Sequence, residues 1–400
     1  MKKDIIIIGA GPSGLSFAAS LANSGLNILV VERSSKSDLQ LPSYDGREIA
    51  LTLPSVNILK QLNVWSRIDE QLISPIKAAK VLDGNSSYSL DFSDGQNTLG
   101  YLVSNHLIRK ALYEEVSNLN NVEIIADTSV ENIKNDGGHT SVFLSNKETI
   151  EAPLVVAADS RFSEARRKMG IPANLHDFAR TMILCKIEHE KPHGNVAFEY
   201  FDYDRVIALL PMPRNASSLV ITVPASTANQ VINMDEQQFL LDITNRFGNE
   251  LGKISLASKR FSYPLVAVYS DKFVADRFAL VGDAAVGMHP VTAHGFNLGL
   301  HGQDILAKEI KLALMQGGDI GARKVLEKYQ SKHTKATKTL YLGTNLIINL
   351  FTNNHTLTKL FRKVTLRVAN NKFLPFKRMI VNRLTGRSNR FSSLQLRPHL

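Results

Sequence analysis

The first residues whose type and spacing could do chemistry are the glycines of segment 9–14, which reads Gly-Ala-Gly-Pro-Ser-Gly. This segment follows an apolar run, residues 4–9, and opens a stretch of small residues, 14–24. The first glycine permits a tight turn, the second lets backbone approach a pyrophosphate, and the third allows a helix to pack closely on a strand. The start of that helix would face phosphates with its partial positive charge.

An acidic residue, Glu32, ends a second apolar run, residues 26–32. A carboxylate there can accept hydrogen bonds from both hydroxyls of a ribose. A glycine turn with an unrelated surface glutamate would give the same letters, but the order strand, turn, helix and strand favours a nucleotide-binding βαβ unit. An acid at this position fits FAD and NAD equally.

Two further apolar runs end in aspartate. Residues 154–159 end at Asp159, and residues 278–283 end in Gly-Asp at Asp283, ahead of Gly295. An aspartate at a strand end can bind a ribityl hydroxyl, and a glycine at the following helix start lets a flavin ring approach backbone with no side chain between them. Three such strand ends in one chain favour FAD.

The elements that must position these residues follow from hydrophobic periodicity. Helices are predicted over 54–63, 105–118 and 297–315, and strands of the nucleotide-binding part over 122–126, 130–134, 141–144, 154–158 and 278–281. Short β-rich runs separated by polar turns occupy 182–187, 196–201, 206–210 and 219–223. These runs are typical of a mostly antiparallel sheet, which would offer a platform for a substrate.

The fold class is therefore α/β, a Rossmann-like FAD-binding domain into which an antiparallel β-sheet domain is inserted, followed by a helical tail. The FAD-binding domain is predicted over 1–75, 101–171 and 271–330, and the substrate-binding sheet over 76–100 and 172–270. A basic helical region is predicted over 331–400.

Composition limits the location of the protein. The single cysteine, Cys185, excludes an intramolecular disulfide and indicates a reducing compartment, so a cytoplasmic protein is expected. The apolar run after Met1 breaks into the glycine segment, which favours a buried strand over a signal peptide. No stretch of 18 uninterrupted apolar residues is present, so no membrane-spanning helix is expected.

The net charge of +10 is concentrated in the tail, where residues 331–400 hold 14 Lys or Arg and no Asp or Glu. The remaining 330 residues hold 33 basic and 37 acidic residues. Such a block predicts either helices that pack on the body with a solvated basic face, or peripheral contact with anionic lipid at the inner face of the membrane. Nucleic acid is not expected as a partner. The apolar positions of the tail recur at helical spacing, at Leu357, Leu360, Phe361, Val364 and Val368.

Together these motifs resemble the class A flavin-dependent monooxygenases, the aromatic hydroxylase family, over nearly the whole chain. Residues 45–51 look like the segment whose arginine, here Arg47, lies near the flavin, and residues 105–112, with Arg109, look like the helix that reaches the FAD pyrophosphate. Within the family, residues 289–300 and the segments 350–354, 366–369 and 375–386 are most similar to the ubiquinone-biosynthesis hydroxylases. The sequence departs from the family pattern at Ser160, which stands where glycine is usual, at 292–295 (Thr-Ala-His-Gly) and at Val286.

The resemblance implies hydroxylation of a polyprenylated phenol or quinol by FAD, NADH or NADPH, and O2, through a flavin C4a-hydroperoxide. Catalytic roles fall on Arg47, on Pro290 and on His289, which is either a proton carrier or a structural residue of its loop. The histidines show no ligand spacing with one another or with Cys185, so no metal site is expected. The predicted cofactor-binding residues are Gly9, Gly11, Pro12, Ser13, Gly14, Glu32, Arg33, Arg47, Arg109, Val130, Asp159, Gly282, Asp283, Pro290, Gly295, Phe296 and Asn297.

Three other functions fit parts of the sequence. A catabolic hydroxylase of a small aromatic acid would share the motifs, but it would not need so basic and apolar a tail. A flavin halogenase would carry a tryptophan motif near the cofactor, and the only tryptophan, Trp65, has no such context. A non-catalytic flavoprotein subunit of a quinone-synthesis complex would bind FAD without oxidising NAD(P)H.

Overall fold

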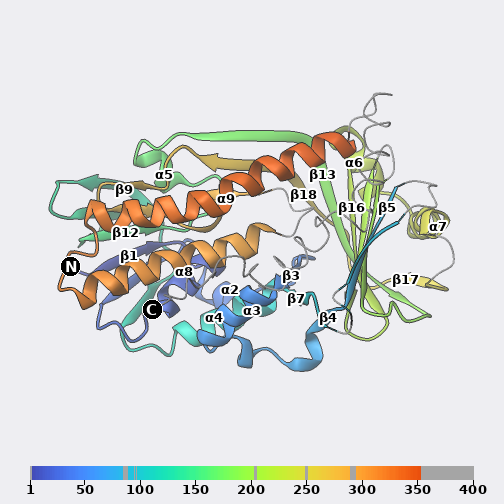
Figure 1. Ribbon diagram of the computed structural model, residues 1–400, viewed down its shortest axis with the longest axis horizontal. Helices are drawn as coiled ribbons and strands as arrows, with labels where there is room; N and C mark the ends of the chain where they lie inside the picture. The colour runs from blue at the N-terminus through green and yellow to red at the C-terminus, as the bar shows by residue number, and fades with distance from the viewer. Residues whose placement is uncertain are drawn as a thin grey trace, which may run out of the picture.

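The structure is a computed structural model that describes residues 2–83, 89–93, 95, 97–201, 205–247, 251–288 and 294–352. Within these residues a six-stranded, mostly parallel sheet covered by helices lies beside a nine-stranded sheet that stands at one end of the molecule (Figure 1). The predicted α/β class, with a mostly antiparallel sheet inserted into a Rossmann-like body, is confirmed.

The six-stranded sheet has the order β19-β20-β12-β1-β2-β8. Neighbours from β20 to β8 run parallel, and β19 pairs antiparallel with β20. Every residue of β1, β2, β12 and β20 is buried, as expected for parallel strands covered on both faces. The strands are β1 (Ile5–Ile8), β2 (Ile28–Val31), β8 (Val122–Ile125), β12 (Leu154–Ala157), β19 (Val274–Ala275) and β20 (Phe278–Leu280).

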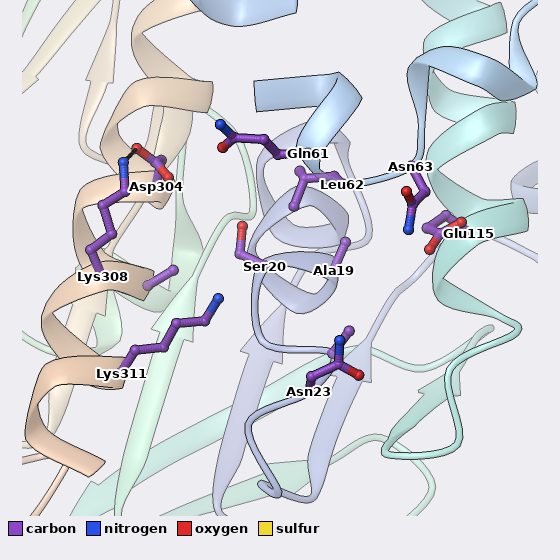
Figure 2. A pocket seen from close by; sticks show the side chains of 12 residues that line it. Ala19, Ser20, Asn23, Gln61, Leu62, Asn63, Glu115, Asp304, Lys308 and Lys311 are labelled. Atoms are coloured by element: carbon purple, nitrogen blue, oxygen red, sulfur yellow. Dashed lines mark hydrogen bonds and ion pairs between the residues drawn. The ribbon is translucent and has the colours of Figure 1, made fainter. Parts of the chain in front are cut away.

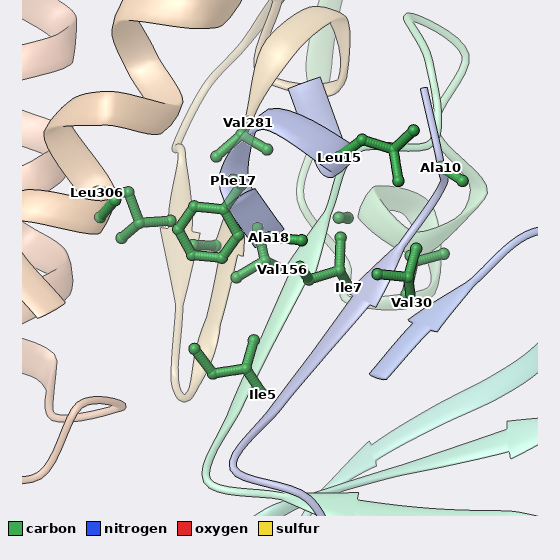
Figure 3. Close-up of a cluster of buried hydrophobic side chains, with 14 of the residues drawn as sticks. Ile5, Ile7, Ala10, Leu15, Phe17, Ala18, Val30, Val156, Val281 and Leu306 are labelled. Atoms are coloured by element: carbon green, nitrogen blue, oxygen red, sulfur yellow. The ribbon is translucent and has the colours of Figure 1, made fainter. Parts of the chain in front are cut away.

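Helices cover this sheet and seal its core. The helix α1 packs against both α4 and α8, and α8 and α9 lie side by side along one face of the body (Figure 1). Figure 3 shows Phe17 of α1 among Val156, Val281 and Leu306, all of which are buried. The helices of the body are α1 (Pro12–Ser20), α2 (Lys36–Gln40), α3 (Leu53–Gln61), α4 (Asn105–Val116), α5 (Glu164–Lys168), α8 (His294–Met315) and α9 (Arg323–Thr352), with short 3-10 turns at Trp65–Arg67, Glu70–Leu72 and Gly282–Ala284.

The nine-stranded sheet follows the order β21-β18-β13-β16-β15-β14-β5-β6, with β17 paired to β13. All neighbours are antiparallel except β5 and β14. Its outer face packs on α6 (Ala225–Ile232) and α7 (Glu236–Phe247). The strands are β5 (Ala78–Asp83), β6 (Ser89–Ser93), β13 (Ala173–His189), β14 (Val196–Phe201), β15 (Val206–Met212), β16 (Ala216–Pro224), β17 (Ile254–Leu256), β18 (Phe261–Ser270) and β21 (Val286–Gly287).

The predicted strand over 182–187 was wrong in extent, because β13 begins at Ala173. Its first part pairs with β18, and the register shifts between Asp177 and Thr181, where Ala179 has a φ of +50°. This part is largely exposed and polar, so it carries no alternation of apolar residues that would reveal a strand.

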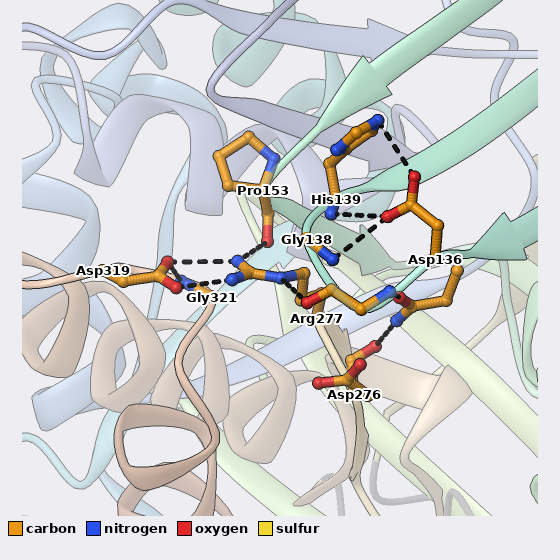
Figure 4. Close-up of polar contacts among 10 residues, drawn as sticks. Asp136, Gly138, His139, Pro153, Asp276, Arg277, Asp319 and Gly321 are labelled. Carbon is orange, nitrogen blue, oxygen red and sulfur yellow. Dashed lines mark hydrogen bonds and ion pairs between the residues drawn. The ribbon is translucent and has the colours of Figure 1, made fainter.

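Two small sheets complete the body. One joins β3 (Glu48–Thr52), β7 (Gly100–Ser104) and β4 (Ser74–Ile76), and the other joins β9 (Val130–Asn135), β10 (Thr140–Leu144) and β11 (Thr149–Ala152). Arg277, in the turn between β19 and β20, connects the second small sheet to the segment before α9. Its guanidinium donates to the carbonyl oxygens of Gly137 and Pro153, each at 3.1 Å, and pairs with Asp319 at 2.7 Å (Figure 4).

The helix α9 runs from Arg323 to Thr352 and passes through residue 331, where the basic tail was predicted to begin. The apolar positions expected between Leu357 and Val368 lie outside the described residues. Among the helices that the structure describes, none is long and apolar enough to cross a membrane.

Candidate functional site

The carboxyl ends of four neighbouring strands bring the sequence motifs together. The strands β20, β12, β1 and β2 are consecutive in the sheet, and they are followed by Asp283, Asp159, Gly9 and Glu32 respectively. Because these strands run parallel, all four residues lie at one edge of the sheet. Ligands of open parallel sheets bind at this edge.

Two glycines of segment 9–14 are required by the packing of the protein itself. Gly9 has a φ of +105°, and a Cβ there would lie 2.7 Å from the carbonyl oxygen of Ala158. A Cβ on Gly14 would lie 2.0 Å from the carbonyl oxygen of Gly9. These glycines therefore let α1 approach the ends of β1 and β12, as the motif predicts.

Two other predicted glycines are not required by packing. Gly11 has an ordinary φ of −72° and is the N-cap of α1, and a Cβ there would meet no atom within 4 Å. A Cβ on Gly295, in the first turn of α8, would meet only the backbone nitrogen of Met288, at 4.0 Å. The open space beside both backbones fits an FAD, whose pyrophosphate would lie beside Gly11 and whose ring would lie beside Gly295.

Ser13 has a packing role between these two regions. Gly282 has a φ of +62°, and a Cβ there would lie 2.3 Å from the Ser13 hydroxyl oxygen. A Cβ on Gly299 of α8 would lie 2.9 Å from the same oxygen. Ser13, next to Pro12 at the start of α1, is thus packed closely against both Gly282 and Gly299, and glycine at these two positions makes room for its hydroxyl.

Glu32 is held in place by backbone donors. Its two carboxylate oxygens accept hydrogen bonds from the backbone N–H groups of Ala10, at 2.6 Å, and Ser34, at 2.8 Å. Each oxygen has a second lone pair that can accept a ribose hydroxyl. The neighbouring Arg33 is exposed.

The two strand-end aspartates have different contacts. Asp159 accepts the Ser163 hydroxyl at 2.5 Å and the backbone N–H of Ala165 at 3.0 Å, so its carboxylate stabilises the start of α5. Asp283 accepts one hydrogen bond from Arg161 at 3.1 Å, and its side chain is 35% exposed. Asp283 is thus the aspartate with free acceptor capacity toward a ligand.

Ser160 adopts the backbone conformation of the glycine that it replaces. Its φ is +88°, in the left-handed region that glycine favours. The turn after β12 therefore keeps its shape despite the departure from the family pattern.

The start of α8 is tied to β3. The Asn297 side-chain amide donates to the carbonyl oxygen of Ala50 at 2.9 Å, and its oxygen accepts the backbone N–H of Thr52 at 3.0 Å. The helix begins at His294, three residues before the predicted start, so Gly295 lies within the helix. Phe296 packs against the main core.

Arg47 lies where the two main parts of the molecule meet. Its guanidinium pairs with Asp45 at 2.5 Å and lies 5.6 Å from the ring centroid of Tyr263 on β18. Asp45 also accepts a hydrogen bond from the side-chain amide of Asn105, the first residue of α4. Arg109 lies about one turn farther along the same helix. Val130 begins β9 and packs against the main core. His289 and Pro290 lie outside the described residues.

Glu48 is a half-buried carboxyl near this region that the sequence analysis did not single out. Both of its carboxylate oxygens lie 2.8 Å from the Ser104 hydroxyl, which is its register partner across the β3–β7 pair. Burial, helped by the nearby Asp45, raises the pKa of Glu48 to about 7. The hydrogen bond from Ser104, the Tyr44 hydroxyl and the positive charge of Lys186 act in the opposite direction and lower this pKa. No spacing along the chain links residues 48, 104 and 186, so only the strand pairing reveals this group.

A pocket of about 230 Å³ lies elsewhere, at the carboxyl end of α1 (Figure 2). Its walls include Ser20 and Asn23, the end of α3, and Lys308 and Lys311 of α8. Since α1 has nine residues, this pocket is about 13 Å along the helix from segment 9–14. It is therefore separate from the site at the sheet edge.

Known proteins resemble this chain over nearly its whole length. The profile of the FAD binding domain family matches residues 2–341. The "Ubiquinone hydroxylase UbiM" of Neisseria meningitidis is 47% identical over 393 residues, which cover 96% of this chain and 85% of that protein. The "3-demethoxyubiquinol 3-hydroxylase" of Escherichia coli is 27% identical, with 92% of this chain and 94% of that protein covered.

Solved structures share the fold. The p-nitrophenol 4-monooxygenase PnpA of Pseudomonas putida superimposes with a TM-score of 0.77 at 18% identity, covering 97% of this chain and 99% of that chain. The probable FAD-dependent monooxygenase pqsL of Pseudomonas aeruginosa gives a TM-score of 0.77 at 17% identity, covering 91% of this chain and 100% of that chain. From the family profile, the relatives and the strand-edge site, the chain belongs to the FAD-binding family of class A flavin monooxygenases.

Proposed function

We propose that this chain is a monooxygenase that uses FAD, NAD(P)H and O2 to hydroxylate the ring of a polyprenylated phenol or quinol intermediate of ubiquinone biosynthesis. The observation that carries this proposal is the 47% identity, over 96% of the chain, with a ubiquinone hydroxylase. When bound, FAD accepts hydride from NAD(P)H and supplies the activated oxygen. The task of the protein is then to hold the substrate ring beside the flavin and to exclude water.

Residues at the sheet edge would hold the cofactor. The backbone at Gly11, with the start of α1, would face the pyrophosphate, Glu32 the ribose and Asp283 the ribityl chain. Arg47 would lie beside the flavin ring. His289 and Pro290, outside the described residues, stay proposed catalytic residues of the flavin loop.

The inner face of the nine-stranded sheet would hold the substrate. Ile183, Cys185 and Ile187 of β13 pack outward with the helices, so Leu184 and Lys186 point inward. On β15, Leu210 packs inward against the same cluster as Ala50 of β3. This face mixes apolar side chains with polar ones such as Lys186, Ser218 and Thr222, and it lies near β3, which is bonded to the start of α8, so it could hold a hydroxylated ring.

Deletion of the gene tests the function. The proposal expects ubiquinone to disappear and a precursor that lacks one ring hydroxyl to accumulate, with recovery on complementation. Unchanged quinones, with loss of growth on a small aromatic acid, would instead identify a catabolic hydroxylase. If deletion removes ubiquinone but the purified wild-type protein never oxidises NAD(P)H, the chain is a non-catalytic subunit.

The tail would bring the enzyme to its lipid-soluble substrate. Fourteen basic residues without an acidic one attract anionic headgroups. This attraction fades as the Debye length falls from about 10 Å at 0.1 M salt to about 3 Å at 1 M. Sedimentation with anionic liposomes is therefore expected to be strong at low salt and much weaker at high salt. Changing Arg362, Lys363 and Arg367 to Gln should reduce it further and leave the FAD content unchanged. Absence of binding at every salt concentration would make the tail a structural cap.

A further inference from the structure

Glu48 lies next to the region where the flavin ring would bind. The side chain of Asn297, in the first turn of α8 with Gly295, is bonded to Ala50 and Thr52 of β3. Glu48 precedes Ala50 by two residues on the same strand. Two residues of a strand span about 7 Å, so Glu48 is one side-chain position along β3 from the backbone that holds α8.

The side chain of Glu48 points toward the large sheet. Side chains alternate along a strand, so Glu48 and Ala50 share one face of β3 while Leu51 takes the other. Ala50 packs against the same small cluster as Leu210 and Ala197 of the nine-stranded sheet, and Leu51 belongs to the core of the body. Glu48 therefore lies on the face of β3 that is turned toward the nine-stranded sheet.

Polar groups from three elements surround Glu48. The Ser104 hydroxyl carries a single proton, so it can donate to only one of the two carboxylate oxygens at a time. The other charged and titratable groups that act on Glu48 are Tyr44 and Asp45 from the preceding loop and Lys186 from β13. A carboxylate has about four acceptor sites, so Glu48 keeps acceptor capacity beyond the Ser104 and Tyr44 hydroxyls, and the positive charge of Lys186 favours its ionised form.

We propose that Glu48 is the base that takes the proton from the ring hydroxyl of the phenolic substrate. This inference rests on the proposed function. The phenolic O–H bond breaks, an O–H bond forms on the Glu48 carboxylate, and the electron pair left on the phenolic oxygen enriches the ring carbons that must attack activated oxygen. A phenol of ordinary pKa, about 10, is almost wholly protonated at neutral pH and needs such a base.

The direct test is Glu48→Gln, which keeps the shape of the side chain but cannot take up a proton. The wild-type rate is expected to rise with pH through an apparent pKa near 7, because Glu48 must be ionised. In the variant, kcat at pH 7 should fall roughly 100- to 10,000-fold. Its rate should recover toward pH 10 as the phenol ionises without help, a recovery that a merely structural role would not produce.

Ser104→Ala tests the assignment of the pKa. The Ser104 hydrogen bond lowers the pKa of Glu48, so its loss should move the rising limb of the rate profile to higher pH with FAD content unchanged. Infrared difference spectra against Glu48→Gln should show the same carboxyl titrating near pH 7 without any turnover. A carboxyl that titrates near its ordinary value of about 4.3 would overturn the proposal.

A matched control separates this carboxyl from another one. Burial also raises the pKa of Glu199 on β14 to about 8. Three strand spacings, about 14 Å, separate β14 from β13 and Lys186. Because Phe198 packs outward, Glu199 lies on the same inner face as Lys186 and is the competing carboxyl there. Loss of the limb in Glu199→Gln, with the limb kept in Glu48→Gln, would refute the role of Glu48. A wild-type enzyme that hydroxylates no phenol refutes the proposed function, whereas an active enzyme that Glu48→Gln leaves unchanged refutes only this inference.

Discussion

Gly11 and Gly14 belong to one motif, but alanine at the two positions should fail in opposite ways. A Cβ at Gly14 would lie 2.0 Å from the carbonyl oxygen of Gly9, so α1 must move away from β1. A Cβ at Gly11 meets nothing within 4 Å and suits the observed φ of −72°. Gly14→Ala should therefore lower stability, and Gly11→Ala should lower FAD affinity alone.

The magnitudes separate the two variants. Overpacking against backbone costs about 3 kcal/mol at the upper end of its usual range. With an unfolding entropy of roughly 2.1 cal/mol/K per residue over the whole chain, this lowers Tm by about 3–4 °C. At Gly11, the entropy gain of alanine, about 0.4–1 kcal/mol, is offset by the weaker N-cap preference of alanine, so the net change is close to zero. Losing one hydrogen bond to a charged pyrophosphate, about 1.5–3 kcal/mol, raises the Kd of FAD roughly 10- to 150-fold.

The assay combines thermal unfolding of the apoproteins, followed by circular dichroism, with titration of each apoprotein by FAD, followed by flavin fluorescence. Wild-type apoprotein is the reference for both variants. Two results would contradict the reasoning: Gly11→Ala that binds FAD with the wild-type Kd, or Gly14→Ala that melts at the wild-type temperature. The first would place the pyrophosphate away from Gly11, and the second would mean that α1 is free to shift.

Two further variants test single residues. Ser160→Gly should stabilise the protein by about 0.5–1 kcal/mol, because the removal of left-handed strain, about 1–2 kcal/mol, outweighs the entropy that glycine adds to the unfolded chain. The midpoint of urea denaturation measures this change, and a lower midpoint would show that the serine side chain makes a stabilising contact. Arg47→Ala should slow turnover more than it lowers FAD content, since its ion pair with Asp45 is half-exposed and worth less than about 1 kcal/mol to the fold; apoprotein as the main product of purification would assign Arg47 to cofactor binding instead.

The sequence was sufficient for the buried parallel strands and for the order of the two main parts. β1, β2 and β12 are continuous apolar runs, and a run of this kind has few alternatives to a sheet covered on both faces. The first half of β13 was missed because its side chains are exposed and polar, and its conformation is set by pairing with β18. Periodicity reports burial, so a strand with little burial leaves little trace in the sequence.

The candidate site divides in the same way. Residues of the glycine segment were found because their spacing is local and fixed by the geometry of one turn and one helix. Glu48 was not found, because its partner Ser104 lies 56 residues away and Lys186 belongs to the other sheet. A carboxyl group becomes a candidate base only when folding buries it, and burial of a lone polar residue has no pattern in the sequence.

Asp159 and Asp283 show what a motif leaves open. Both follow a buried parallel strand, and the sequence assigned both to the cofactor. In the structure, Asp159 uses both oxygens to hold Ser163 and Ala165 at the start of α5, whereas Asp283 has a single partner, Arg161. Asp159 is committed to the start of α5 through both oxygens and keeps only their second lone pairs, whereas Asp283 has one partner and a side chain that is 35% exposed, so it has more acceptor sites open to a ligand hydroxyl. The ribityl contact is therefore better assigned to Asp283, and the role of Asp159 is to shape the turn that supports it.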